Sequence, residues 1–263
     1  MEPVRSFCKD SLAVRIYAGR TAMGAAAARD GAALLRRLLA QQDTVRAVFA
    51  AAPSQNEFLE ALCAAPDIDW KRVTAFHMDE YVGLDAAAPQ GFGNFLRARV
   101  FDRLPFGQVC YLNGNAPDVE AECSRYAGLL AQAPIDIVFM GIGENGHIAF
   151  NDPPVAEFDD PAAVKVVALD EVCRNQQVHD GCFADIGQVP THALTLTVPT
   201  LAGAKHHLCI VPAPTKAKAV RDTLEGPVST ACPASILRTC PGAVLYLERE
   251  SAQLLTEDRK SVV

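Results

Sequence analysis

The sequence predicts an α/β fold: a single-domain, doubly wound (Rossmann-like) and mostly parallel sheet with helices on both faces and a lid segment. Short apolar or β-branched runs alternate with longer helical stretches along the 263 residues. Several runs are apolar throughout, as in strands of a parallel sheet that is covered on both faces. No internal repeat, low-complexity tract or long Pro/Gly/Ser linker divides the chain, so we expect one domain over residues 1–263.

The expected strands are short apolar runs, and their length favours strands over helices. They are Ala13–Ala18, Val45–Ala50, Val73–Met78, Ile135–Met140, Val164–Leu169, Ala193–Val198, His207–Val211 and Ala243–Leu247. A doubly wound sheet binds its ligands at the carboxyl ends of its strands, so residues that follow these runs are candidates for a site.

Four stretches are predicted helices. Thr21–Leu39 is rich in Ala, Leu and Arg, and Gln55–Cys63 follows Ser54, a residue type that caps helices. Pro117–Leu130 opens with proline in its first turn, and Thr215–Leu224 is amphipathic. These helices supply the crossovers that a parallel sheet requires.

The least regular region is residues 153–190. It contains several prolines, a cluster of acidic residues and few long apolar segments. Long irregular segments of this kind often carry function, so we expect a mobile excursion or lid here.

Charge and apolar content limit the classes of function. The formal net charge of -7 argues against broad nucleic-acid binding, which needs a basic face, although it leaves an anionic small ligand possible. The N-terminal stretch has no apolar run of signal length, and no stretch reaches the roughly 20 apolar residues that span a bilayer. We therefore expect neither secretion nor a membrane partner.

The nine cysteines are spread singly, without a C-x-x-C pair or Cys/His spacing of the zinc-finger kind. This distribution gives no support to a disulfide framework or to a structural metal. It fits a reduced, cytoplasmic compartment best.

The segment GIGENG contains a G-x-G-x-x-G pattern, formed by Gly141, Gly143 and Gly146, between two expected strands. Asp170 ends the second strand, as a dinucleotide fingerprint requires. Such a fingerprint also needs a crossover helix, in a connection of at least about 10 residues. A helix starting near position 145 would end within two turns at residues 151–154, which read NDPP. The dinucleotide interpretation therefore fails.

A tight turn remains at this strand end, and we expect it to expose Asn145, His147 and Asp152 beside a short helix. His147 and Asp152 are separated by five positions, so a turn after Phe150 can bring the carboxylate back toward the imidazole. Taken alone, His147 is as readily an ordinary surface histidine as a catalytic residue.

Acidic residues follow a second strand. The run VTAFHM leads directly into Asp79 and Glu80, at the edge where a doubly wound sheet binds ligands. Adjacent strand positions point to opposite faces, so only one of the two should face a pocket. The alternative is that both serve as turn or capping residues.

Three motifs together, FHMDEYVGL, LNGNAPD and GIGENGHIAFNDP, resemble the signatures of glucosamine-6-phosphate deaminases. The resemblance extends from about Ala47 through Lys216 to the C-terminal strand. The related 6-phosphogluconolactonases share the fold and a Gly-His turn, but not the M-D-E-Y-V-G block or the A-F-N-D/E-P tail. The resemblance implies a cofactor-free isomerisation of an amino-sugar phosphate to a ketose phosphate, with loss of ammonia.

The same resemblance implies the catalytic roles. His147 opens the sugar ring, since imidazole can both take and return a proton near neutral pH. Asp79 is the base that moves a proton from C2 to C1, and its neighbour Glu80 is structural. Asp152 is the main charged partner of His147, and Asn145 helps to orient the ring.

The resemblance also implies the substrate contacts. We expect Gly143 and Gly146 to contact the substrate from their turn, and Lys216 to bind its phosphate. Ser54 caps the following helix, so that free N–H groups there can meet the anion.

The chain departs from the family pattern at several of these positions. Asn145 stands in place of an aspartate and Asp152 in place of a glutamate, and an amide cannot supply the charge of a carboxylate. Residues 51–56 read AAPSQN in place of a Gly/Thr-rich turn. The lid arginine of the family has no clear counterpart in Val178–Phe183, and we do not assign Arg174 to that role.

Two other functions remain open. A sugar-lactone hydrolase would use His147 to activate water and would not need Asp79. A non-catalytic sugar-phosphate-binding protein would bind the ligand without turnover. By resemblance we also expect a possible homo-oligomer, and no activation by N-acetylglucosamine 6-phosphate, because the stretch after the tail offers acids and no cation before Lys165.

Overall fold

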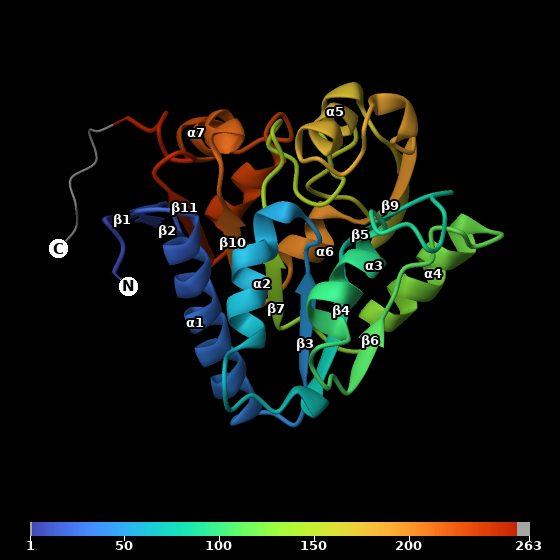
Figure 1. Cartoon of the computed structure of the whole chain (residues 1–263), viewed down its shortest axis with the longest axis horizontal. Coiled ribbons are helices and arrows are strands. Elements are labelled where there is room, and N and C mark those ends of the chain that lie inside the picture. Colours follow the sequence, from blue (N-terminus) through green and yellow to red (C-terminus); the bar gives the residue numbers. More distant parts are fainter. Residues whose placement is uncertain (1, 257–263) are drawn as a thin grey trace.

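The computed structural model describes residues 2–256 and is built on an eight-stranded sheet (Figure 1). Its strand order is β1-β2-β11-β10-β7-β3-β4-β6, and every neighbouring pair is parallel except β1 and β2. The bounds are β1 (Arg5–Lys9), β2 (Leu12–Tyr17), β3 (Val45–Phe49), β4 (Val73–His77), β6 (Gln108–Cys110), β7 (Ile137–Met140), β10 (His206–Val211) and β11 (Val244–Glu248).

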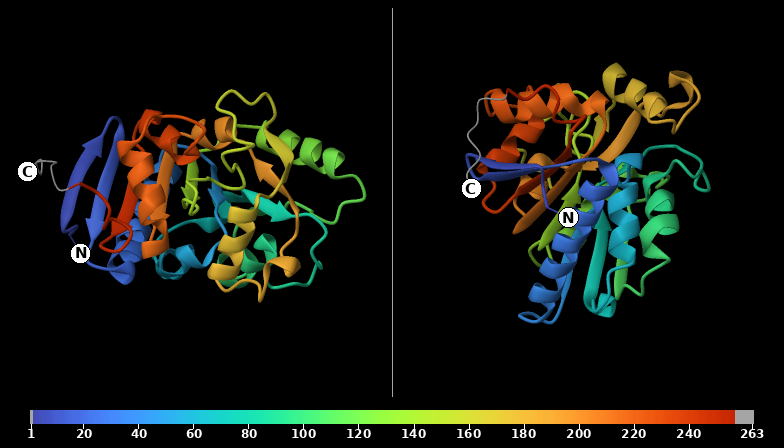
Figure 2. Two further views of the ribbon diagram at one scale, coloured as in Figure 1. Left: turned by 90° about the horizontal axis from the view of Figure 1, so that it is seen from above. Right: turned by 60° about the vertical axis from the view of Figure 1, so that its left-hand side comes forward.

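Helices cover both faces of this sheet (Figure 2). On one face lie α1 (Arg20–Leu39), α2 (Asn56–Cys63) and α3 (Phe92–Leu96), and on the other α4 (Val119–Leu130), α6 (Val198–Ala202) and α7 (Ala217–Glu225). Two apolar cores result, because alternate strand residues point to opposite faces. Phe49 packs with α1 and α2 in the first core, and its neighbour Val48 belongs to the second.

The order of strands reverses in the middle of the sheet. After β3 the chain continues outward to β4 and β6, whereas after β7 it continues the other way to β10 and β11. The carboxyl ends of β3 and β7 therefore diverge at a switch point, where open α/β sheets form their ligand crevice. The doubly wound α/β class expected from the sequence is confirmed.

Two expected strands do not belong to this sheet. β8 (Val164–Ala168) and β9 (His192–Leu196) pair antiparallel with each other, and β9 pairs with β5 (Asp79–Tyr81). Their assignment to the main parallel sheet was wrong. Helix α5 (Glu171–His179) lies between them without crossing a sheet face, so the returning strand pairs antiparallel.

Residues 153–190 are more regular than the sequence indicates, because they contain β8 and α5. Figure 1 shows α5 at the end of the molecule where the strands of the main sheet end. The short helix expected near Asn145 is absent from the described chain, and residues 141–150 form turns instead. None of the described helices is both long and apolar enough to cross a membrane. All nine cysteines are free thiols.

Candidate active site

A pocket of about 540 Å³ opens at the carboxyl ends of the central strands. Its walls come from the segments that follow β3, β4, β7 and β10, together with α5. The lining residues are Ala50, Ala51, Ala52, Ser54, Gln55, Met78, Asp79, Phe92, Gly141, Ile142, Gly143, His147, Ala149, Phe150, Gln176, Gln177, Asp180 and Lys216. The structure therefore brings Asp79, His147, Ser54, Gly143 and Lys216 to one cavity, although they lie far apart in sequence.

The carboxyl group of Asp79 is buried, and nothing around it offsets the cost of burying its charge. Its side chain lines the pocket at 8% exposure, and one carboxylate oxygen lacks a hydrogen-bond partner among the described residues. Burial, and then the negative charge of Glu80, raise the pKa of Asp79 well above its usual value. A carboxylate with a raised pKa is a stronger proton acceptor than an ordinary one.

Glu80 has a different task. Its carboxylate accepts hydrogen bonds from the backbone N–H groups of Tyr81 (2.9 Å), Phe92 (3.0 Å) and Gly93 (2.8 Å). These contacts fix β5 to the start of α3. Glu80 faces a separate hollow beside the pocket, so only Asp79 of the two lines the candidate site.

The fully buried imidazole of His77 holds the backbone of Asp79. Its Nε2 accepts the N–H of Leu112 at 3.0 Å, so the ring proton must lie on Nδ1, which is 2.8 Å from the carbonyl oxygen of Asp79. Burial lowers the pKa of His77, and the ring stays neutral. The position of Asp79 is thus set by a side chain two residues before it.

His147 is paired with Asp152. Its Nδ1 lies 2.8 Å from Oδ1 of Asp152, although the N–H is not aligned with that oxygen as in a full hydrogen bond. Asn145 donates to the same Oδ1 at 2.8 Å, and its own Oδ1 accepts the backbone N–H of His147 at 3.1 Å. The three residues thus form one connected group, as their spacing allows.

His147 and Asp152 are buried and Asn145 is half-buried, which corrects the expectation that the turn would expose all three. His147 is 7% and Asp152 1% exposed. Burial alone would raise the pKa of Asp152, but the imidazole of His147, the Asn145 amide and the thiol of Cys173 outweigh it and lower that pKa. Asp152 therefore remains charged beside the ring.

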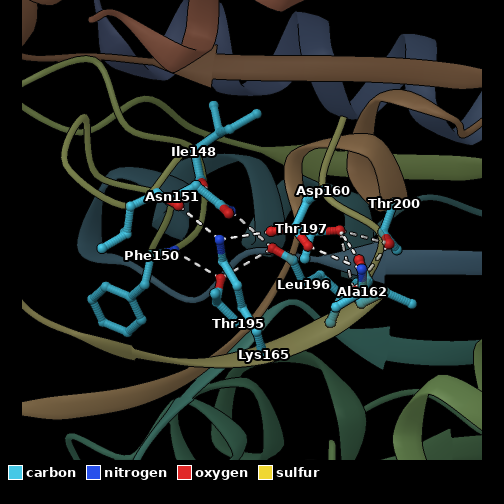
Figure 3. A network of polar contacts seen from close by, with 12 residues as sticks. Ile148, Phe150, Asn151, Asp160, Ala162, Lys165, Thr195, Leu196, Thr197 and Thr200 are labelled. Carbon is cyan, nitrogen blue, oxygen red and sulfur yellow. Dashed lines mark hydrogen bonds and ion pairs between the residues drawn. The ribbon is translucent and has the colours of Figure 1, made fainter. Parts of the chain in front are cut away.

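The turn that returns Asp152 to His147 is anchored to β9 (Figure 3). The buried amide of Asn151 donates to the carbonyl oxygens of Ile148 (2.9 Å) and Leu196 (2.8 Å), and the N–H of Phe150 donates to Oγ1 of Thr195 at 3.0 Å. Ala149, between them, has φ +49°, a conformation that costs a non-glycine residue about 1–3 kcal/mol. Strain at this point indicates that the surrounding contacts determine the turn.

Two glycines in the turn have steric roles. A Cβ on Gly143 would lie 2.1 Å from Cε1 of His147, so only glycine lets the ring occupy its place. Gly146 has φ +85°, and a Cβ there would lie 2.6 Å from Sγ of Cys232. Gly143 lines the pocket, as expected, whereas Gly146 packs against Cys232 instead.

Lys216 is the sole Lys or Arg among the described residues that line the pocket, and it is 4% exposed. Burial lowers its pKa, while the carboxylates of Asp180 and Glu144 act in the opposite direction. No described residue forms a hydrogen bond or ion pair with its ammonium group. An anionic ligand would therefore find here a cation that is free to bind it.

Ser54 lines the pocket but does not cap α2, which corrects the expectation from the sequence. The segment starts with a tight 3₁₀ turn at Pro53, so Ser54 lies inside the turn and not at a helix start. Its Oγ accepts a hydrogen bond from Nε2 of Gln55 at 3.2 Å.

Sequence reasoning missed the contribution of α5 and of Gln55. Gln176, Gln177 and Asp180 line the pocket from α5 and its end, and no motif marks them. Gln176 also accepts the N–H of Glu144 at 2.7 Å, which attaches α5 to the His147 turn. Arg174 donates to the carbonyl oxygens of Ile186 and Val189, so it braces the loop after α5.

Outside the pocket, Lys165 is fully engaged by its own segment. Its ammonium group lies 2.7 Å from a carboxylate oxygen of Asp160 and donates to the carbonyl oxygen of Val155 at 2.7 Å. Lys165, the first cation in sequence after the A-F-N-D tail, is thus already paired with Asp160.

Comparisons with known proteins identify the family of the chain. The sequence model of the family described as glucosamine-6-phosphate isomerases/6-phosphogluconolactonase matches residues 18–246. A glucosamine-6-phosphate deaminase of Listeria innocua is 38% identical over 202 residues, which cover 77% of this chain and 84% of the relative. A second, of Bacillus thuringiensis, is 38% identical over 190 residues, or 72% of this chain and 71% of the relative.

Solved structures give the same picture. A monomeric glucosamine-6-phosphate deaminase superposes with a TM-score of 0.83 at 30% identity, over 92% of this chain and 99% of that one. A 6-phosphogluconolactonase from Thermotoga maritima superposes with a TM-score of 0.73 at 18% identity, over 90% and 99%. At that identity, the second similarity shows a shared fold only.

Proposed function

The chain belongs to the family of glucosamine-6-phosphate isomerases and 6-phosphogluconolactonases, and from this we propose that it converts glucosamine 6-phosphate, or a close amino-sugar phosphate, to fructose 6-phosphate and ammonia. The observation that carries the proposal is that Asp79, His147 and Lys216 line one pocket. They supply an uncompensated carboxyl base, an imidazole with a charged partner, and a free cation.

His147 opens the sugar ring. It takes the proton of the anomeric hydroxyl and returns a proton to the ring oxygen, which breaks the bond between C1 and that oxygen. Asp152 stabilises the imidazolium that forms in between, since its carboxylate lies 2.8 Å from Nδ1. Asn145 adds a hydrogen bond that fixes the carboxylate, but no charge.

Asp79 carries out the isomerisation. It removes the proton from C2 of the open-chain sugar while the C1 carbonyl oxygen takes up a proton, which gives an enolamine. It then delivers a proton to C1, and loss of a proton from the amino nitrogen leaves an imine at C2 and a hydroxyl group at C1. Water hydrolyses the imine to the ketone and releases ammonia. A base with a raised pKa suits the first transfer, and a single carboxylate placed between the two carbons serves both.

Lys216 binds the phosphate end of the substrate, with Ser54 and the amide of Gln55 beside it. An ammonium group that is 4% exposed interacts with an anion in a medium of low dielectric, so its contribution exceeds that of a surface lysine. We also propose that the protein works in the cytoplasm and that it can form a homo-oligomer, as its resemblance to the family implies.

A direct assay tests the proposal. Ammonia and ketose phosphate are measured with the 6-phosphates of glucosamine, galactosamine and their N-acetylated forms, and hydrolysis is measured with 6-phosphogluconolactone. Ammonia release from an amino sugar is the expected result. Lactone hydrolysis without ammonia release would favour the hydrolase alternative, and tight binding without any turnover would favour a sugar-phosphate-binding protein.

A further inference from the structure

Three metal-ligating side chains converge beside the pocket. A ring nitrogen of His147, a carboxylate oxygen of Asp152 and Sγ of Cys173 all lie within 4.8 Å of one another, and all three residues are buried. His147 and Asp152 belong to the turn after β7, whereas Cys173 comes from α5. Cys173 has no part in the proposed reaction, so the proximity of its thiol is not explained by catalysis.

We propose that these three side chains form an inhibitory binding site for a divalent d-block cation, Zn²⁺ above all, which joins α5 to the His147 turn. Imidazole, carboxylate and thiolate together suit Zn²⁺, whereas Mg²⁺ and Ca²⁺ prefer all-oxygen sites. Three protein ligands leave the fourth tetrahedral position for water or a substrate oxygen.

The geometry needs only a small adjustment. Zinc bonds of about 2.0–2.3 Å place the ligand atoms of a tetrahedral site roughly 3.3–3.7 Å apart. Here Nδ1 of His147 and Oδ1 of Asp152 are 2.8 Å apart, and the thiol lies within 4.8 Å of both. The imidazole and carboxylate must separate slightly while Sγ moves inward.

Metal binding exchanges one cation for another. The thiol of Cys173 loses its proton to solvent, and the metal takes the place of that proton between sulfur and carboxylate. Affinity should therefore rise with pH, because each bound metal releases a proton.

The site conflicts with the proposed reaction. A metal bound to His147 and Asp152 removes the imidazole from proton transfer and takes the charge that would stabilise its cation. It also ties α5 to the turn, in addition to the Gln176 contact with Glu144. Inhibition therefore depends on the proposed function, whereas metal binding itself does not.

Access to the ligands should be slow. Asp152 and Cys173 are each 1% exposed, so a cation reaches them only when α5 moves away from the turn. We expect inhibition by Zn²⁺ to develop with time, and a chelator to reverse it on a similar time scale.

Cobalt spectroscopy on the chelator-treated, full-length protein tests the site without an activity assay. Co²⁺ should give a near-ultraviolet thiolate-to-metal absorption band that Zn²⁺ then removes. Cys173→Ser should abolish the band and weaken Zn²⁺ binding, measured by calorimetry, at least about 100-fold. Cys182→Ser is the matched control, a thiol of the same region outside the cluster, and it should retain both.

Circular dichroism confirms that each variant is folded, and Cys173→Ala serves if the serine variant is not. The proposal is overturned if the wild-type protein gives no thiolate band, or if substitution of Cys173 leaves the band and the Zn²⁺ affinity unchanged. If Zn²⁺ binds as described in a protein that releases no ammonia, the site stands and the proposed function fails.

Discussion

Asp79 and Asp152 are two buried aspartates of the candidate site, and their pKa values are shifted in opposite directions. Asp79 is surrounded by apolar groups and a like charge, and its pKa is raised. Asp152 contacts an imidazole, an amide and a thiol, and its pKa is lowered. This is so although Asp152 is more deeply buried, with 1% of its surface exposed against 8% for Asp79. The proposed reaction uses the first carboxyl group as a proton carrier and the second as a fixed charge.

The difference in pKa between Asp79 and Asp152 arises from the groups around each carboxylate and not from burial. Burial acts on both carboxyl groups in the same direction, since it penalises the charged form. Only Asp152 has an amide that donates a hydrogen bond to it and an imidazole beside it, and these offset the penalty. In the proposed reaction, Asp79 takes up and releases a proton and lacks such partners, whereas Asp152 stays charged and is surrounded by them.

Of the predicted changes, removal of the Asp79 carboxylate should have the largest effect on turnover. Asp79→Asn should reduce turnover by about 10²- to 10⁴-fold, while ligand binding changes by less than about tenfold, or about 1.4 kcal/mol. Solvent hydrogen exchange at C2 of the substrate reports the proton transfer directly. If the variant kept half of the wild-type exchange rate, Asp79 would not be the proton carrier.

Removing the imidazole should have an effect that depends on direction. His147→Gln should slow conversion of the cyclic amino sugar by roughly 10²-fold, and the reverse reaction of the open-chain ketose phosphate with ammonia much less. Only the former needs the pyranose ring to open. Initial rates in both directions decide the point, and equal losses would move His147 from ring opening to general positioning.

A third aspartate lines the pocket beside Lys216, and it should act mainly on substrate affinity. Asp180→Asn should lower KM for the phosphorylated substrate by roughly 3- to 10-fold, or about 0.7–1.4 kcal/mol, because one negative charge no longer opposes the phosphate. The value of kcat should be unchanged. Steady-state kinetics test this, and a raised KM would show that Asp180 aids binding.

Substitution of Asp79 and substitution of Asp152 should change the melting temperature in opposite directions. The raised pKa of Asp79 means that its ionisation destabilises the fold as pH rises through that pKa, so Asp79→Asn should raise Tm near pH 7 by about 2–4 °C. The lowered pKa of Asp152 gives stability above its unfolded pKa that is lost as pH falls through the folded one, so Asp152→Asn should lower Tm near pH 7. Calorimetry across pH tests both, and shifts of the same sign would contradict the comparison.

The last prediction concerns an added sugar phosphate, for which we expect no effect on activity. N-acetylglucosamine 6-phosphate at millimolar concentration should not shift the substrate-saturation curve, because Lys165 is already paired with Asp160 and Val155. Without a free cation, the acidic stretch offers no site that would favour one conformation over another. A leftward shift of the curve would reveal an effector site elsewhere.

The sequence allowed prediction of the residues that follow strands. Asp79 stands directly after an apolar run and His147 in the turn that follows another, and parallel strands bring such positions to one edge. The return of Asp152 to His147 follows from the spacing, but burial of the pair does not, because it depends on α5 and β9 covering the turn. The spacing of His147 and Asp152 in the sequence could not reveal that α5 and β9 lie over this turn.

The residues that sequence reasoning missed lie on short or polar elements. The helix α5 reads EVCRNQQVH, which carries no apolar period, so neither its helical state nor the approach of Cys173 and Gln176 to the pocket was predictable. β5 has three residues, too few for a periodic signal. Its pairing with β9 moved two expected strands out of the main sheet.

The small sheet of β5, β9 and β8 has a mechanical consequence. Asp79 lies opposite Thr195 on β9, Lys165 of β8 pairs with the other side of Thr195, and α5 begins three residues after β8 ends. Two ladders of hydrogen bonds thus connect the segment before α5 to Asp79. We therefore expect a movement of α5 that opens the pocket to displace Asp79 as well.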